Sequence, residues 1–127
     1  MKANILVLGV GAAGVGEQII KCLNLQNEID TTIIGTDINE NSFGRSLVDK
    51  FYKVPLASSL NYFEVQKEII CENNINFIFH GSDPDMMFLN QNRKYFLEEN
   101  IGLSINSKEV INLCQNKFDT YEALKNE

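Results

Sequence analysis

Short apolar runs alternate with amphipathic stretches along the whole chain. Residues 5–8 form a continuous apolar run that ends at a glycine, as buried parallel strands do, and residues 14–25 follow with apolar side chains at helical spacing. The same alternation continues to the C-terminus. Further strands are expected at residues 31–36, 51–54, 76–79 and 103–105, and further helices at residues 43–49 and from Asn61, Asp83, Asn106 and Lys117.

This alternation predicts an α/β fold of the Rossmann-like type, an open, mostly parallel sheet of about five strands with helices on both faces. Right-handed crossovers give the strand order 3-2-1-4-5. No internal repeat or linker interrupts the pattern, so residues 1–127 are expected to form a single domain. Ligands of such sheets bind beyond the carboxyl ends of the strands, near the point where the strand order reverses. The loops that follow residues 8, 36 and 79 are therefore the candidate site.

Composition narrows the classes of partner. The chain has 11 basic and 17 acidic residues, a net charge of −6, which argues against binding to nucleic acid or to an anionic membrane surface. No apolar run approaches the roughly 20 residues of a membrane span, and no signal peptide is recognisable, so a cytoplasmic location is expected. Three scattered cysteines and one histidine cannot supply a zinc site of the usual spacing.

The first candidate loop, residues 9–14, is a GxGxxG motif between a predicted strand and a predicted helix. Gly9, Gly11 and Gly14 would allow a tight turn, close approach of a ligand to the backbone and close helix packing. The free N–H groups of the helix start favour an anion. The lysine and hydroxyl residues of a phosphate-binding P-loop do not follow. A purely structural role, in which the glycines only permit the turn, stays open.

Asp37 ends the second predicted strand, at the same edge of the sheet. In dinucleotide-binding folds an acid at this point accepts hydrogen bonds from ribose hydroxyls. As a loop residue it would instead cap the turn at residues 39–41, and both roles stay open. His80, the only histidine, follows the fourth strand, where we expect a packed or hydrogen-bonded residue rather than a catalyst.

Two acids open the helix expected after the fourth strand. Asp83 suits the N-cap position, with Pro84 as the first helical residue and Asp85 in the first turn. The alternative is a ligand-binding role. Two carboxylates at this edge would repel a pyrophosphate and favour an amine or a hydroxylated substrate.

Five segments together resemble the N-terminal domain of ATP-grasp ligases, with the closest likeness to the large chain of carbamoyl phosphate synthase. Their order and spacing across nearly all of the chain carry the resemblance, and the last segment weighs most. Asn116 departs from the family, which usually has Asp before the lysine of that segment, and His80 stands where relatives often have Val, Ile or Pro. The segments are residues 5–14, 34–37, 52–55, 76–85 and 116–125.

The resemblance implies a reaction class. Such enzymes use ATP and Mg²⁺ to phosphorylate a carboxylate, and an amine or another nucleophile then displaces phosphate from the acyl phosphate. Carried onto this chain, Asp83 or Asp85 would hold a substrate amine or hydroxyl. Lys117 resembles the lysine that reaches an ATP phosphate, although by itself it would be a solvated helix residue. The other expected substrate-binding positions are Gly9, Gly11 and Gly14, through their backbone groups, and Asp37.

The family places ATP between two later domains, and their acidic magnesium ligands do not occur in these 127 residues. We therefore expect a fragment of a longer ligase that is inactive alone and binds no cofactor tightly, with the C-terminal ATP-grasp domains as its partners. The alternative is the NAD(P)-binding domain of an oxidoreductase, because Asp37 follows the GxGxxG loop by about 20 residues. A non-enzymatic nucleotide-sensing or scaffolding module of the same fold is a third possibility.

Overall fold

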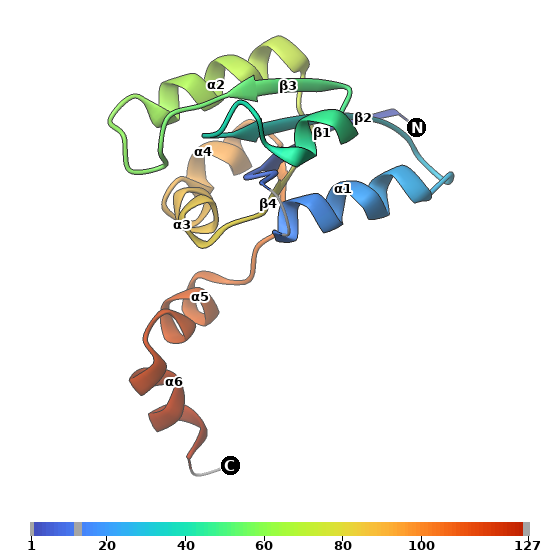
Figure 1. Cartoon of the computed structure of the whole chain (residues 1–127). Helices are drawn as coiled ribbons and strands as arrows, with labels where there is room; N and C mark the ends of the chain where they lie inside the picture. The colour runs from blue at the N-terminus through green and yellow to red at the C-terminus, as the bar shows by residue number, and fades with distance from the viewer. Residues whose placement is uncertain (1, 12–13, 126–127) are drawn as a thin grey trace.

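The computed structural model describes residues 2–11 and 14–125. Five parallel strands form one open sheet in the order β3-β2-β1-β4-β5, which confirms the predicted fold class and strand order (Figure 1). The order reverses between β1 and β4, as expected for the site. The strands are β1 (Lys2–Leu8), β2 (Asp30–Asp37), β3 (Lys50–Lys53), β4 (Phe77–His80) and β5 (Gly102–Leu103).

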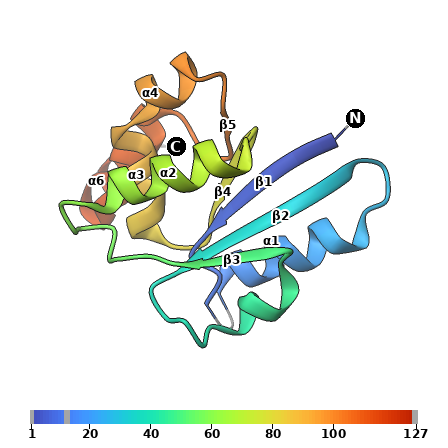
Figure 2. The same ribbon diagram turned by 90° about the horizontal axis from the view of Figure 1, so that it is seen from above.

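Helices cover both faces of the sheet, α1 with the short 3₁₀ helix η1 on one face and α2, α3 and α4 on the other (Figure 2). Within the described part of the chain, no helix is long and apolar enough to cross a membrane. The helices are α1 (Val15–Leu25), η1 (Phe43–Leu47), α2 (Tyr62–Asn73), α3 (Asp83–Gln91), α4 (Arg93–Glu98), α5 (Lys108–Gln115) and α6 (Lys117–Leu124).

The central strand β1 is buried on both faces, which explains its continuous apolar run. Successive side chains of a strand point to opposite faces. Val7 packs into the cluster under α1, whereas Leu6 and Leu8 pack into the larger cluster under α2, α3 and α4. The larger cluster also contains Tyr62 and Phe88, whose rings meet edge to face with centroids 4.8 Å apart. Tyr62 is thereby fixed at the start of α2, next to the carboxyl edge of the sheet.

Helices α5 and α6 project away from the sheet and pack mainly against each other (Figure 1). Ile111 is the buried side chain of this pair, and Ser107 caps α5 by accepting a hydrogen bond from the Val110 N–H. Asn106, at which the sequence pattern starts this helix, precedes that cap. The large apolar side chains left exposed on the pair are Val110, Leu113, Phe118, Tyr121 and Leu124.

Three glycines bring the ends of β1 and β4 into backbone contact with the start of α1. Gly9 has a positive φ of 69°. A Cβ atom added to Gly16 would lie 2.3 Å from the Gly9 carbonyl oxygen, and one added to Gly81 would lie 2.2 Å from the same oxygen. Gly14, by contrast, has room, since its added Cβ would meet nothing closer than 3.4 Å. The glycine that close packing requires is therefore Gly16, in the first turn of α1, and not Gly14, the last glycine of the motif.

This crossing predicts a large difference between Gly16, in the first turn of α1, and Gly14, just before that helix. Gly16→Ala should destabilise the fold by about 2 kcal/mol or more, because the methyl group meets backbone that cannot move alone. Gly14→Ala is the matched control and should stay within about 1 kcal/mol of the parent, since its φ of −90° suits alanine. Urea unfolding measures both. Equal midpoints for the two variants would contradict this account of the crossing.

Candidate functional site

A pocket of about 370 Å³ lies at the carboxyl edge of the sheet, at the reversal of strand order. It joins the three loops that the sequence selects, together with the segment after β3 and the start of α2. The volume falls in the usual range for small-molecule sites. The residues that line it are Gly9, Gly11, Gly14, Asp37, Ile38, Val54, Pro55, Leu56, Ala57, Tyr62, Gly81, Ser82, Pro84 and Asp85.

Two glycines of the motif make room for acidic side chains. A Cβ atom added to Gly9 would lie 2.6 Å from Asp85 Oδ2, and one added to Gly11 would lie 3.3 Å from Asp37 Oδ2. Gly14 lines the pocket as the residue before α1. Residues 12–13 of the motif lie outside the described part of the chain. Carboxylates of the protein therefore occupy the space beside the loop. In a phosphate-binding glycine loop, the bound anion occupies this space.

Asp37 combines the two roles that the sequence left open. Its Oδ1 accepts a hydrogen bond from the Asn39 N–H at 2.8 Å, which is the loop-capping role. Its side chain also lines the pocket although the residue is only 8% exposed. Asp37 Oδ2 has no hydrogen-bond partner among the described residues and remains available to a ligand.

Asp85 is held from two sides inside the pocket. The Tyr62 hydroxyl donates to Oδ1 at 2.7 Å, and the Ser82 hydroxyl donates to Oδ2 at 2.5 Å. Tyr62 is 2% exposed and Asp85 is 8% exposed. Burial, followed by the charge of Asp85 and the hydrogen bond to it, raises the pKa of the Tyr62 phenol well above its usual range. The phenol therefore stays protonated and keeps donating to Asp85.

The start of α3 differs from the sequence prediction. Ser82 and not Asp83 is the N-cap, because its extended backbone lets the side chain accept from the Asp85 N–H at 3.3 Å. Asp83 is the first helical residue, is exposed and does not line the pocket. Of the two acids in this loop, Asp85 alone faces the pocket.

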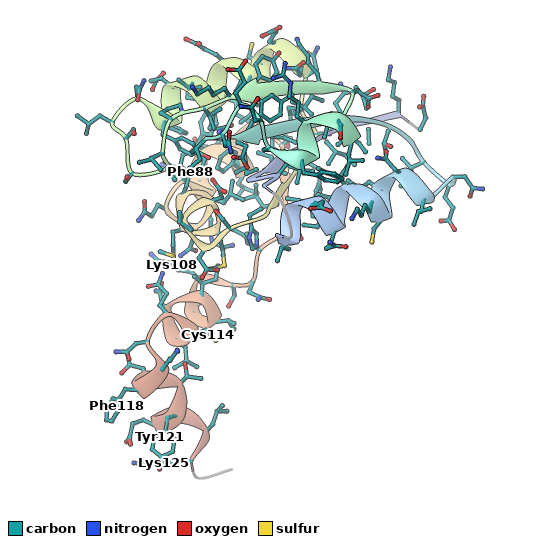
Figure 3. All side chains as sticks on the ribbon, in the orientation of Figure 1. Phe88, Lys108, Cys114, Phe118, Tyr121 and Lys125 are labelled. Carbon is teal, nitrogen blue, oxygen red and sulfur yellow. The ribbon has the colours of Figure 1, made fainter. Side chains whose placement is uncertain are left out.

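Lys117 and His80 lie outside the pocket. Lys117 is the exposed first residue of α6 and lines a separate hollow on the projecting helix pair. Tyr121, another residue of this lining, is labelled on the same helix in Figure 3. Asn116 caps α6 by accepting from the Phe118 N–H at 2.9 Å. Asparagine is among the residues preferred at this position of a helix. His80 is half-buried at the end of β4, opposite Leu8 of β1.

Sequence reasoning missed Tyr62 and Ser82 as site residues. Tyr62 is a buried core residue at the start of α2. The overlooked signal is chemical, since a buried tyrosine hydroxyl needs a hydrogen-bond partner and Asp85 is the acid of the neighbouring loop. Ser82 was hidden because Asp83 beside it is an equally good capping residue.

The pocket carries two carboxylates and no lysine, arginine or histidine among the described residues that line it. The N-termini of α1 and α3 also lie at the pocket, since their N-cap residues, Gly14 and Ser82, line it. In the described part of the chain, no group of three or more histidine, cysteine or acidic residues is placed to hold a metal ion. The described lining, with two carboxylates and an apolar wall, suits a small molecule held by charge and shape.

The fold defines the class of the domain, an open parallel α/β sheet of the Rossmann-like type. Residues 5–105 match the family described as PylC-like, N-terminal domain, and the chain belongs to this family. The resemblance to the N-terminal domain of ATP-grasp ligases drawn from the sequence motifs is confirmed. None of the curated proteins matches the chain at the sequence level.

Solved structures show the same fold. N5-Carboxyaminoimidazole synthetase from Staphylococcus aureus, complexed with ADP, is 16% identical with a TM-score of 0.64. That match covers 98% of this chain but only 30% of the enzyme. The biotin carboxylase domain of 2-oxoglutarate carboxylase from Hydrogenobacter thermophilus is 20% identical, with a TM-score of 0.59 over 97% of this chain and 27% of that one.

An NAD-bound dTDP-glucose 4,6-dehydratase from Bacillus anthracis also matches, with 20% identity and a TM-score of 0.56 over 80% of this chain and 36% of that one. At these identities the likenesses show the fold alone. The family match, and not the neighbours, therefore favours the ATP-grasp interpretation over the oxidoreductase alternative. The chain spans about 30% of the length of the synthetase.

The Tyr62–Asp85 pair predicts an alkaline loss of stability that one substitution removes. Above the ordinary tyrosine pKa of about 10, the unfolded chain releases the phenol proton whereas the raised pKa keeps it on folded Tyr62. Stability is therefore full below that pH and falls above it, by up to about 1.4 kcal/mol per pH unit. Urea unfolding between pH 8 and 11.5 should show a smaller fall for Tyr62→Phe than for the parent.

Tyr121→Phe is the matched control, because it removes an exposed tyrosine on α6. Its stability should fall with pH in parallel with the parent. A Tyr62→Phe profile that also runs parallel to the parent would show that the buried phenol does not keep its proton.

Proposed function

We propose that this chain is the substrate-side domain of an ATP-grasp ligase, one that activates a carboxylate as an acyl phosphate for attack by an amine or another nucleophile. The observation that carries the proposal is the pocket beside the glycine loop, in a chain that belongs to the PylC-like N-terminal family. Its position at the reversal of strand order supports a ligand site on general grounds.

In this proposal the pocket binds the substrate and the chemistry occurs at its border with later domains. Gly9, Gly11 and Gly14 line the pocket and present backbone to the substrate, with the Asp85 carboxylate beside Gly9 and the Asp37 carboxylate beside Gly11. Asp37 and Asp85 supply the polar contacts, since both carboxylates line the pocket. Asp83, being exposed and outside it, has no assigned role.

ATP and Mg²⁺ belong in this proposal to C-terminal ATP-grasp domains of a longer protein. Their chemistry is the transfer of a phosphoryl group, which needs positioned cationic charge. The described residues gather no metal-binding cluster, and the pocket offers acidic rather than basic side chains. Lys117 is the one residue of this chain that we assign to ATP, as a phosphate contact. Its exposed place on the projecting helix pair, apart from the pocket, is compatible with contact to another domain.

The ATP-grasp proposal predicts that the isolated chain neither hydrolyses ATP nor binds NAD⁺. ADP release in the presence of ATP and Mg²⁺ should equal the protein-free blank, because the proposal assigns phosphoryl transfer to other domains. Millimolar NAD⁺ should leave the melting temperature unchanged, whereas a ligand at 100 times its Kd stabilises by about 2.7 kcal/mol, a shift of several degrees.

ADP release above the blank would overturn the assignment of catalysis to other domains. A melting shift with NAD⁺ that Asp37→Ala abolishes would instead favour the oxidoreductase. The control for this variant is Asp119→Ala on α6, which removes an exposed acid far along the chain from the pocket.

A further inference from the structure

Asp37 and Asp85 are two nearly buried carboxylates that share one pocket without a cationic partner. Each is 8% exposed, and neither takes part in any ion pair of the described residues. A carboxylate removed from water is costly unless a positive charge or several donors compensate it. Among the described residues that line the pocket, no positively charged side chain compensates these two carboxylates.

The oxygens that face the pocket have free acceptor capacity. Asp37 Oδ2 has no hydrogen-bond partner among the described residues, and it lies beside Gly11, which carries no side chain to cover it. Each oxygen of Asp85 accepts one hydroxyl hydrogen bond and retains a second lone pair. Three donors of a primary ammonium group match such a set of acceptors, whereas a carboxylate or phosphate would be repelled.

The hydrogen bonds to Asp85 fix where its charge lies. Tyr62 is anchored in the core by its edge-to-face contact with Phe88, and Ser82 is anchored by its capping bond to the Asp85 N–H. Donors on both oxygens leave the carboxylate one orientation, with Oδ2 against the Gly9 backbone. Preorganised charge of this kind costs a ligand less to engage than a freely rotating side chain.

The rest of the pocket is apolar and suits a carbon body. The segment after β3 forms one wall with Val54, Pro55, Leu56 and Ala57, and Ile38 adds to it from the end of β2. Leu56 is 56% exposed although it lines the pocket, so this wall has apolar surface left to cover. An aliphatic or aromatic group that carries an ammonium would satisfy both parts of the pocket at once.

We propose that the pocket selects a ligand with a protonated primary amine on an apolar body, held by Asp37 Oδ2 and Asp85, with Tyr62 and Ser82 as the residues that position Asp85. This inference rests on the proposed function only in treating the pocket as a substrate site. It narrows that site to cationic ligands and excludes phosphate-bearing ones.

The test compares three probes with the same four-carbon body, n-butylammonium, n-butanol and n-butanoate, at pH 7 and constant ionic strength. Amide chemical shifts of the ¹⁵N-labelled chain report binding residue by residue. We expect saturable shifts at the loops around Asp37 and Asp85 with n-butylammonium, at least tenfold weaker binding of n-butanol, and none of n-butanoate. Methyl β-D-ribofuranoside, which offers the hydroxyls of a nucleotide sugar, should bind more weakly than n-butylammonium.

Asp37→Asn keeps the shape and removes one charge, and it should weaken n-butylammonium at least tenfold. Asp83→Asn is the matched control, because it removes the same charge from an exposed position near the pocket that does not line it. Its affinity should stay within twofold of the parent. Equal losses in the two variants would show an unspecific effect of net charge and overturn the proposal.

The positioning role has its own test. Tyr62→Phe and Ser82→Ala should each lower the ratio of n-butylammonium to n-butanol affinity at least threefold. Ser82→Thr keeps a hydroxyl that can also cap α3, and its ratio should equal that of the parent. A variant that only loosened the fold would weaken both probes alike and leave the ratio unchanged, which would overturn the positioning role.

Tighter binding of n-butanoate or of the ribofuranoside than of n-butylammonium, or no shift with n-butylammonium at 100 mM, would overturn the amine proposal. No arm of the experiment uses ATP. The amine proposal can therefore fail while the ATP-grasp assignment stands, and the reverse.

Discussion

The close backbone crossing at Gly9, Gly16 and Gly81 is the constraint on which the site depends. It brings the ends of β1 and β4 against the first turn of α1, at the point where the strand order reverses. The β4 end then continues through Ser82 into α3, so Asp85 is carried to the Gly9 backbone. Without this crossing the glycine loop and the acidic helix start would be separate features. With it, they form two walls of one pocket.

The backbone crossing also explains why the pocket carries negative charge. A glycine loop before a helix usually leaves space for an anion on the free N–H groups. Here Asp85 Oδ2 fills the space beside Gly9, and Asp37 Oδ2 stands beside Gly11. The helix ends still contribute partial positive charge, which stabilises these carboxylates inside the protein. The same loop geometry that serves phosphates elsewhere therefore holds built-in anions in this chain.

The fold was predictable because it rests on local patterns, whereas much of the site was not. Residues 5–8 show burial on both faces, and the alternation of strands and helices gives the sheet order. Asp37 follows from its position at the end of a strand, and Asp85 from its position in the first turn of the helix after the fourth strand. The Tyr62–Asp85 hydrogen bond joins residues 23 positions apart on two helices, and no spacing rule predicts it. The choice of Ser82 over Asp83 as the cap depends on backbone angles that two adjacent capping residues leave undecided.

The hydrogen bonds of the pocket are suited to holding a ligand rather than to reacting with it. Ser82 is a nucleophilic side chain beside an acid there, but its oxygen donates to Asp85 Oδ2 and accepts from the Asp85 N–H. Both of its functions are thus committed to the helix start. Asp85 is fixed by two hydroxyls, and Asp37 caps its own loop. A domain that spends its polar side chains on orientation contributes substrate placement, and placement alone supplies a large part of the rate of a bimolecular step. This division suits an enzyme in which the phosphoryl chemistry is performed by other domains.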